Sequence, residues 1–227
     1  MSDREELKAA VATRALDFVQ PGMVLGLGSG TTMRYFVEGL GRRVAEGMSV
    51  TAVPTSRATA ALARSLKIPI VEDPPRGVDL DVDGADEIDP ELRLIKGYGG
   101  ALVREKLVAA MARRVIIIAD ASKLVPRLGR GVIPVEVIPF LWRATVGRLS
   151  ALGASCSVRG GTASPFLTDN GNMVVDLTFA EPPADPSRLA RQLKKTVGVV
   201  DHGIFIDLAD TCVVAGEDGL RMLGSIP

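Results

Sequence analysis

The chain of 227 residues has few of the residue types that metal and thiol chemistry require. It contains one histidine, and its two cysteines, Cys156 and Cys212, lie far apart and form no Cys-x-x-Cys pair. This composition indicates neither a disulfide framework nor a zinc site. Because His202 has no second histidine or cysteine beside it, we expect a structural or interfacial role rather than membership of a catalytic triad. No metal and no cofactor is expected.

An excess of charge of one sign is also missing, because 27 Lys and Arg residues balance 27 Asp and Glu residues. A neutral chain provides no basic field to attract nucleic acid or a membrane surface. The densest apolar run, residues 115–119, is too short to span a bilayer, and the charged residues 1–8 lack the apolar core of a signal peptide. We therefore expect a cytoplasmic protein with neither nucleic-acid nor membrane partners.

Strands and helices alternate through the first part of the chain. Apolar runs predict strands at residues 23–27, 49–53, 68–71, 78–83 and 115–119. Helical spacing and breaker residues predict helices at 3–19, 32–46, 56–66 and 100–114. This alternation is typical of an α/β fold, here a Rossmann-like, mostly parallel sheet with helices on both faces.

After residue 131 the order of the elements changes. Strands are predicted at 132–138, 154–158, 165–168, 172–179 and 199–206, and helices at 140–152 and 185–198. Asp169-Asn170-Gly171 is a hairpin signal, and Asp185-Pro186 is a helix cap followed by an N1 proline. The order βαββαβ predicts a smaller ferredoxin-like α+β domain. We place it at residues 131–207, with 1–130 and 208–227 forming the Rossmann-like domain.

A glycine-rich loop, residues 26–32, follows the first predicted strand. Glycines between a strand and a helix allow backbone N–H groups to converge on an anion. The dinucleotide fingerprint fails because Thr31 replaces its third glycine, and the Walker motif fails because no Gly-Lys-Ser/Thr is present. The hydroxyls of Ser29, Thr31 and Thr32 indicate a cradle for a single phosphate, and the alternative is a tight turn without a ligand.

An acidic turn follows the strand at 78–83. Residues 79–90 approach the pattern of a calcium loop, but Pro90 occupies the position of the bidentate glutamate, which argues against a metal site. Asp83 and Asp86 instead leave the carboxyl end of the strand, where open α/β sheets bind ligands. The alternative is an acidic surface turn.

Glu105 is an unusual helical carboxylate. Its neighbours at helical spacing include Ala101, Ala109 and Ala112, and no Lys or Arg is spaced to pair with it. Partial desolvation on such a face would raise its pKa toward the range useful to a general base. The alternative is an ordinary amphipathic helix with one isolated glutamate.

Two lysines stand in loops that leave central strands. Lys96 precedes Gly97-Tyr98-Gly99-Gly100, and Lys123 follows the strand at 115–119. Each could be only a solvated surface charge. Because the loops leave the strands at the same end of the sheet, we expect hydroxyls, carboxylates and lysines to converge there.

Seven segments together resemble the type A family of ribose-5-phosphate isomerases, in order and over essentially the full length. They are residues 26–32, 83–87, 96–97, 104–106, 120–123, 134–139 and 168–172. The resemblance implies a Rossmann-like domain with a ferredoxin-like one inserted before the C-terminal strand. It also implies isomerisation of ribose 5-phosphate to ribulose 5-phosphate through an enediolate, in the pentose phosphate pathway, by a homodimer or homotetramer.

The same resemblance implies residue roles. Glu105 would move the proton between C2 and C1, Asp83 and Asp86 would assist ring opening and hydroxyl proton transfer, and Lys96 would stabilise the oxyanion. Further substrate contacts would come from Ser29, Gly30, Thr31, Thr32, Gly84, Ala85, Gly97, Tyr98, Gly99 and Lys123. Tyr98 stands where the family usually has glycine, so we expect this loop to take a different path or its ring to stack on the sugar.

Two alternative functions would each require features of their own in the sequence. A non-catalytic sugar-phosphate sensor would carry a helix-turn-helix segment, for which residues 1–20 are too few. Acyl or coenzyme A transfer would need a nucleophilic glutamate and a pantetheine site, which the sequence does not offer.

Overall fold

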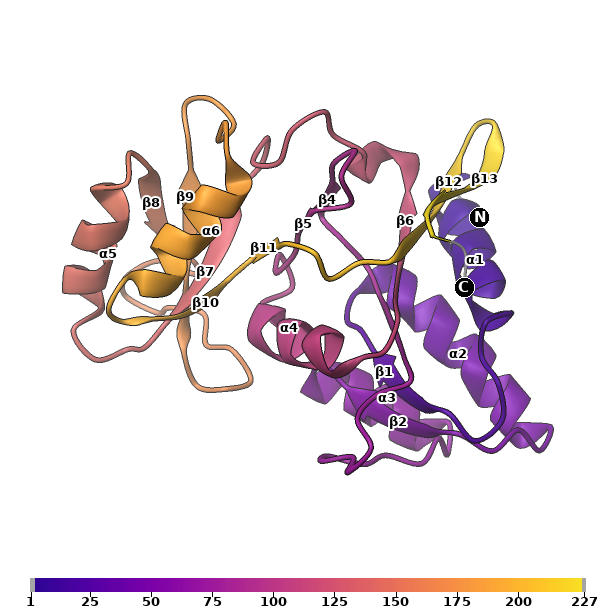
Figure 1. Cartoon of the computed structure of the whole chain (residues 1–227). Coiled ribbons are helices and arrows are strands. Elements are labelled where there is room, and N and C mark those ends of the chain that lie inside the picture. The colour runs from indigo at the N-terminus through magenta and orange to yellow at the C-terminus, as the bar shows by residue number, and fades with distance from the viewer. Residues whose placement is uncertain (1–2, 226–227) are drawn as a thin grey trace. The chain divides into compact units, whose positions relative to one another are not determined.

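Residues 3–225 are described in the computed structural model shown in Figure 1. Their contacts divide the chain into two units. The first unit contains the residues up to Ala85, residues 104–123 and those from Asp207 on, and the second contains residues 86–103 and 124–206. None of the helices within residues 3–225 is long and apolar enough to cross a membrane.

The first unit is built on a six-stranded sheet of order β13-β12-β6-β3-β1-β2. Its strands are β1 (Val24–Leu27), β2 (Thr51–Pro54), β3 (Leu80–Asp83), β6 (Val115–Asp120), β12 (Thr211–Gly216) and β13 (Gly219–Gly224). Only β13 runs antiparallel to its neighbour. Every residue of β3 and β6 is buried, as expected for central strands of a sheet that is covered on both faces.

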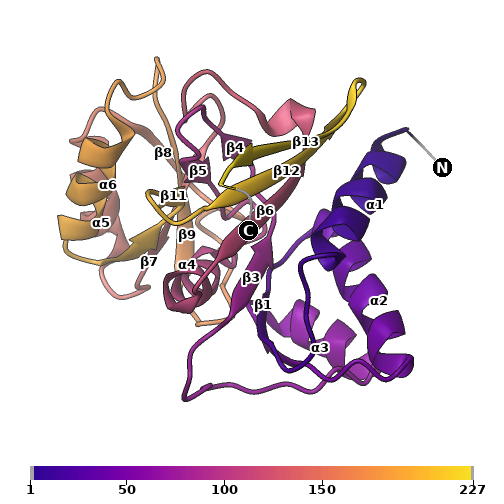
Figure 2. The same cartoon turned by 45° about the vertical axis from the view of Figure 1, so that its right-hand side comes forward.

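Helices cover both faces of this sheet (Figure 2). They are α1 (Asp3–Leu16), α2 (Thr31–Ala45), α3 (Arg57–Ser65) and α4 (Leu102–Met111). Phe36 and Leu40 of α2 share one core cluster with Ile116 and Ile118 of β6. Val108 of α4 belongs to a separate cluster. Side chains alternate between faces along each strand, which gives the sheet one apolar layer under α1 and α2 and another under α4.

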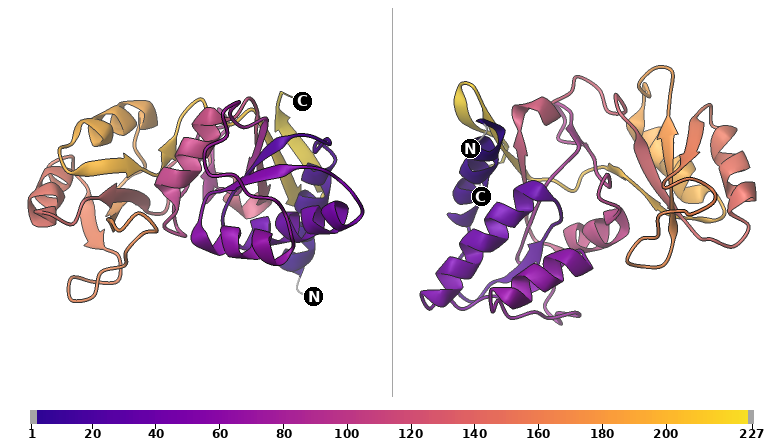
Figure 3. Two further views of the ribbon diagram at one scale, coloured as in Figure 1. Left: turned by 90° about the horizontal axis from the view of Figure 1, so that it is seen from below. Right: turned by 180° about the vertical axis from the view of Figure 1, so that it is seen from behind.

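The second unit contains the predicted βαββαβ order. Its elements are β7 (Ile133–Val137), α5 (Trp142–Ser150), β8 (Ser155–Val158), β9 (Met173–Thr178), α6 (Pro186–Lys195) and β10 (Val199–His202), in an antiparallel sheet of order β10-β7-β9-β8. Both helices lie beside this sheet (Figure 3), and Leu149 and Leu193 share a core with Val135 and Val175. The predicted fold class, Rossmann-like with a ferredoxin-like module, is confirmed.

A third, three-stranded sheet of order β11-β5-β4 was not predicted. It consists of β11 (Ile204–Phe205), β5 (Leu94–Ile95) and β4 (Glu87–Ile88). Because β5 pairs with β11, residues 86–103 group with the second unit rather than with the first. The expected domain boundaries, 1–130 with 208–227 and 131–207, remain a proposal.

Two strand predictions need correction in the second unit. Residues 165–168 form only an isolated antiparallel bridge, Leu167 with Met173, next to a backbone hydrogen bond from Thr168 N–H to the Asn172 carbonyl oxygen at 2.8 Å. The carboxylate of Glu136 accepts hydrogen bonds from Thr168 Oγ1 at 3.1 Å, Asn170 Nδ2 at 3.0 Å and Asn172 Nδ2 at 2.7 Å. The predicted strand at 199–206 is divided at Gly203 into β10 and β11.

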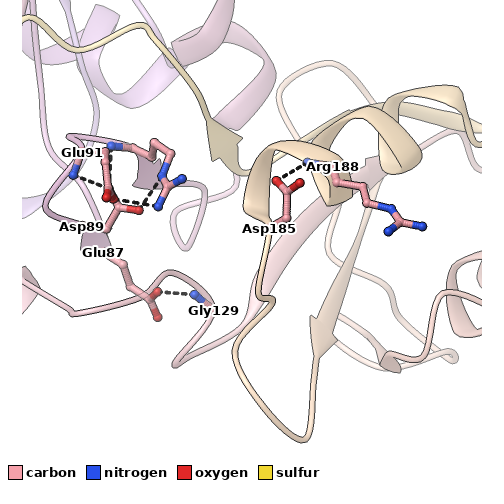
Figure 4. A network of polar contacts seen from close by, with 7 residues as sticks. Glu87, Asp89, Glu91, Gly129, Asp185 and Arg188 are labelled. Atoms are coloured by element: carbon pink, nitrogen blue, oxygen red, sulfur yellow. Dashed lines mark hydrogen bonds and ion pairs between the residues drawn. The ribbon is translucent and has the colours of Figure 1, made fainter.

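The predicted cap of α6 is present. The Asp185 carboxylate accepts a hydrogen bond from the backbone N–H of Arg188 at 2.8 Å (Figure 4), and Pro186 is the first helical residue. A capping carboxylate satisfies a first-turn donor that has no partner within the helix, and proline has no such donor to satisfy.

Two leucines of the first unit should contribute very differently to the free energy of unfolding, because only one of them is buried. Leu40 is 0% exposed and Leu107 is 61% exposed. We expect Leu40→Ala to lower the free energy of unfolding by about 2–5 kcal/mol and Leu107→Ala by less than about 1 kcal/mol. Urea denaturation followed by circular dichroism measures both, and equal losses would contradict the assignment of the core.

The two cysteines should differ in reactivity. Cys212 of β12 is fully buried, and this burial raises the pKa of its thiol to about 12. Only the thiolate reacts, so iodoacetamide at pH 8 should label the half-buried Cys156 and leave Cys212 unlabelled. Mass spectrometry should find one label in the native chain and two in urea. Cys156→Ser is the control, and a labelled native Cys212 would refute the prediction.

Candidate functional site

The glycine-rich loop connects β1 to α2 in the first unit. The helix begins at Thr31, with Gly30 as N-cap at φ 108°, a conformation that glycine adopts far more readily than other residues. No side chain caps this helix, although Thr31 and Thr32 stand beside its N-terminus. The uncapped first turn and the two threonine hydroxyls therefore provide donors for an anion.

Asp83, the last residue of β3, holds this loop. Its Oδ1 accepts hydrogen bonds from the backbone N–H groups of Ser29 at 3.1 Å and Gly84 at 2.7 Å. A Cβ added to Gly28 would lie 2.0 Å from Asp83 Oδ1, so only glycine fits at this position. The glycine of the loop thus makes room for a carboxylate of the neighbouring strand.

Two threonines that the sequence analysis missed support the loop from the α3 side. The hydroxyl of Ser29 lies 2.9 Å from Thr55 Oγ1 and 3.3 Å from Thr59 Oγ1. Thr55 and Thr59 in turn donate to the carbonyl oxygens of Leu27 and Gly28. These contacts fix the Ser29 side chain within a hydroxyl network rather than leaving it to rotate in solvent.

Glu105 lies in the first turn of α4 and is only 5% exposed. Its helix packs against β1, since a Cβ on Gly26 would lie 2.6 Å from Val108 Cγ1. A helix that connects two parallel strands runs antiparallel to them, so the first turn of α4 lies toward their carboxyl ends. Glu105 precedes Val108 by about 4.5 Å along the helix, and Gly28 follows Gly26 by about 6.6 Å along the strand. The two displacements have the same direction, which brings Glu105 toward Gly28 and Asp83.

Lys123 ends a short 3-10 helix, Ala121–Lys123, directly after β6. The segment is fixed by Asp120, whose carboxylate accepts hydrogen bonds from the backbone N–H and the hydroxyl of Ser122. Burial acts to raise the pKa of Asp120, but these bonds and the positive charges of Arg4 and Lys123 outweigh it and lower that pKa. Lys123 is half-buried at the carboxyl end of the sheet, as predicted from its place after β6.

Of the remaining predicted residues, Ala85 belongs to the first unit, and Asp86 and residues 96–99 belong to the second. Asp86 Oδ2 accepts a hydrogen bond from the backbone N–H of Tyr98 at 3.0 Å, so the acidic turn and the glycine loop after Lys96 are joined. Lys96 is only 3% exposed, its backbone N–H donates to Gly203 at 2.9 Å, and its Nζ lies 5.7 Å from the centre of the Phe205 ring. Lys96 is therefore a buried side chain and not a solvated loop lysine.

Tyr98 reaches the segment before β7. Its hydroxyl accepts a hydrogen bond from the backbone N–H of Val132 at 3.1 Å. Beside it, the carboxylate of Glu87 accepts from the N–H groups of Gly129 (Figure 4) and Gly131, both at 2.6 Å. Burial, then the Glu87 and Asp86 charges, raises the pKa of Tyr98, which keeps its hydroxyl protonated. The residue that departs from the usual glycine thus ties the loop to residues 129–132.

A cavity of about 670 Å³ in the first unit contains none of the predicted site residues. It is lined by Val53, Pro54, Ser56, Arg57, Ala60, Arg64, Ile70, Val71, Glu72, Arg104, Leu107 and Val108. Arg104 thus lines this cavity, whereas the adjacent Glu105 is buried. Neighbouring residues of the Arg-Glu-Lys segment therefore differ in their surroundings.

Each unit carries a defined part of the predicted chemistry. The first brings together Ser29, Asp83 and Gly84 by hydrogen bonds, with Thr31, Thr32, Glu105 and Lys123 also at the carboxyl ends of its strands. The second brings together Asp86 and Tyr98 in the loop that begins with the buried Lys96. Among the described residues, no cluster of His, Cys, Asp and Glu is suited to hold a metal ion. The available chemistry is proton transfer by carboxylates beside fixed cations and anion-binding N–H groups.

Comparison with known proteins agrees with these features. The family described as Ribose 5-phosphate isomerase A (phosphoriboisomerase A) matches residues 51–219. A ribose-5-phosphate isomerase A of a Synechococcus strain is 49% identical, over 98% of this chain and 99% of its own length. One from Thermomicrobium roseum is 48% identical, over 96% and 94%.

Solved structures are similar over the same extent. The ribose 5-phosphate isomerase A of Methanocaldococcus jannaschii superposes with a TM-score of 0.91 at 38% identity, over 97% of this chain and 99% of the other. A D-ribose-5-phosphate isomerase in complex with phospho-erythronic acid superposes with a TM-score of 0.93 at 38% identity, over 98% and 100%.

These matches cover both units and favour an enzyme over the non-catalytic sensor considered above. They agree with the anion cradle at α2 and the buried carboxylate of α4, which suit proton transfer on a sugar phosphate. The chain belongs to the ribose 5-phosphate isomerase A family and is an aldose–ketose isomerase.

Proposed function

We propose that Glu105 is the base that carries a proton between C2 and C1 when this isomerase interconverts D-ribose 5-phosphate and D-ribulose 5-phosphate. The burial of its carboxylate in the first turn of α4, at the carboxyl ends of β1 and β3, is the observation that carries the proposal. Bulk water does not compete with the substrate for hydrogen bonds to a buried carboxylate. A single carboxylate can also return at C1 the proton that it removes at C2. The intermediate between the two steps is an enediolate.

The phosphate group is assigned to the loop before α2. Gly30, Thr31 and Thr32 offer backbone N–H groups at an uncapped helix terminus, Ser29 offers a hydroxyl, and Lys123 offers a positive charge. The related isomerase in complex with phospho-erythronic acid supports a phosphorylated ligand of this size. Inorganic phosphate and phospho-erythronic acid are accordingly expected to compete with substrate.

The remaining roles concern the reacting oxygens. Asp83 and Asp86 assist ring opening and proton transfer between hydroxyls, and Lys96 stabilises the negative charge of the enediolate. Burial supports the assignment of Lys96, because a cation acts more strongly on a developing oxyanion where water is excluded. Gly84, Ala85, Gly97, Tyr98 and Gly99 belong to the same two loops and are proposed to contact the substrate through the backbone.

A coupled assay with ribose 5-phosphate, with and without a chelator, tests the function of the purified chain. Turnover that is unaffected by the chelator supports carboxylate and lysine chemistry. Tight binding of ribose 5-phosphate without turnover would favour the sensor and overturn the proposal.

The role of Glu105 has its own test. Glu105→Gln keeps the shape of the side chain and removes the base, so we expect kcat to fall by about 10²-fold or more with little change in KM. Glu6→Gln, an exposed glutamate of α1, is the matched control and should leave both parameters unchanged. Near-normal turnover of Glu105→Gln would refute the assignment.

We further propose that the chain works in the cytoplasm as a homodimer or homotetramer. The second unit has an apolar surface formed by Ile138, Phe140, Leu141 and Val197, which are between 40% and 75% exposed. The segments are adjacent, because Ile138 N–H donates to the Gly198 carbonyl oxygen at 3.0 Å. Exposed apolar patches of this kind commonly mark interfaces between protein copies.

Substitutions that introduce charge on this apolar surface should therefore change the oligomeric state. We expect Phe140→Asp combined with Val197→Asp to shift the chain toward a smaller species in light scattering after size exclusion. Leu220→Asp on β13, where the leucine is 46% exposed, is the control and should leave the assembly unchanged. An unaltered mass of the double variant would exclude this surface as the interface.

A further inference from the structure

The loop that follows Lys96 is held by an arginine from another part of the second unit. Arg159 Nη1 donates to the carbonyl oxygens of Gly97 at 2.9 Å and Tyr98 at 3.0 Å. Arg159 directly follows β8 and is more than sixty residues away in sequence. One guanidinium nitrogen therefore binds two consecutive carbonyl groups of this loop.

The guanidinium is itself fixed by Asp176 of β9. Arg159 Nε donates to Asp176 Oδ2 at 2.9 Å, and Nη2 donates to Oδ1 of the same carboxylate. The two side chains are 18% and 17% exposed. A bidentate pair of this kind fixes the plane of the guanidinium, so Nη1 is held against the loop by a carboxylate of β9.

Phe166 closes over the other end of the loop. A Cβ on Gly100 would lie 2.5 Å from Phe166 Cε1, and the backbone N–H of Phe166 donates to the Arg159 carbonyl oxygen at 2.8 Å. The Arg159 guanidinium lies 5.9 Å from the centre of the Phe166 ring. Arg159 thus holds the loop through its side chain and the residue that covers it through its backbone.

We propose that Arg159, oriented by Asp176, is a positioning residue that fixes residues 96–100 and thereby places the Lys96 ammonium for catalysis; this rests on the role proposed above for Lys96. Three of the four residues after Lys96 are glycines, which have the largest backbone entropy to lose on ordering. The loop therefore needs external hydrogen bonds to keep one conformation. A misplacement of about 1 Å at a catalytic group can cost about 10²-fold in rate.

Two substitutions test the clamp, by which we mean the hydrogen bonds from Arg159 to the carbonyl groups of Gly97 and Tyr98. Arg159→Met keeps a long side chain and removes all of its hydrogen-bond donors. Arg159→Lys retains the positive charge but cannot form the bidentate pair with Asp176. We expect kcat to fall by about 10- to 100-fold in Arg159→Met and by less in Arg159→Lys, with smaller changes in KM. Asp176→Asn should give an intermediate loss, because Arg159 then lacks its charged partner. Arg148→Met, an exposed arginine of α5, is the control and should leave kcat unchanged.

A double-mutant cycle separates positioning from general stability. If Arg159 acts through Lys96, then Arg159→Met should cause little further loss of kcat in a Lys96→Met background, whereas independent effects would multiply. All rates are measured well below the melting temperature of each variant, so that only folded protein is compared. Multiplying losses, or a kcat of Arg159→Met equal to that of the parent chain, would overturn the proposal.

The same cycle distinguishes a failure of the clamp from a failure of the site assignment. Near-normal kcat in Lys96→Met alone would refute the role of Lys96 and, with it, the clamp. A large loss in Lys96→Met with normal kcat in Arg159→Met would refute the clamp and leave the role of Lys96 intact.

Discussion

The approach of the Asp83 carboxylate to Gly28 is the constraint on which the first unit's part of the site depends. Asp83 is 1% exposed, and its Oδ1 accepts two backbone N–H groups, those of Ser29 and Gly84. Burying a carboxylate is costly unless hydrogen bonds replace its water. The loop after β1 and the turn after β3 supply those bonds, so each segment fixes the other. A side chain at position 28 would occupy the space of the carboxylate and separate them.

Much of the fold could be predicted because its signals are local. The apolar run of β6 and the Asp185-Pro186 cap of α6 depend on residues that are neighbours in sequence. The missed elements depend on distant partners. β4 and β5 have only two residues each; they pair with each other, and β5 also pairs with β11, about a hundred residues later. The hairpin signal at 168–172 agrees with the antiparallel bridge of Leu167 with Met173, but no local pattern reveals that the side chains of this turn bond to Glu136.

The features of the candidate site also fall into those that local sequence patterns predict and those that depend on distant residues. The small residues around Glu105 correctly predicted its burial, whereas the glycine-rich loop did not reveal that no side chain caps α2, and anion binding there stays a prediction. Thr55, Thr59 and Arg159 were missed because their side chains form hydrogen bonds with loops that are far away in sequence. Residue type alone does not distinguish such supporting groups from ordinary surface threonines and arginines. The roles of the site residues in catalysis remain proposals that the substitutions above can test.

The proposed site contains several carboxylates, so positive groups must lie at fixed positions near the substrate to offset their negative charge. Asp81, Asp83 and Glu105 are all at most 5% exposed, and the carboxylates of Asp81 and Asp83 lie against Gly26 and Gly28. Several carboxylates close to a phosphorylated substrate would repel it in a region of low dielectric constant. In the proposed mechanism the positive end of α2 and Lys123 oppose that repulsion at the phosphate, and Lys96 opposes it at the reacting oxygens. A lysine serves the second purpose only if its distance to the substrate is fixed, because the interaction falls with separation. A loop rich in glycine does not provide that by itself, so in the proposed mechanism the hydrogen bonds from Arg159, which directly follows β8, contribute to the chemistry as well as to the fold.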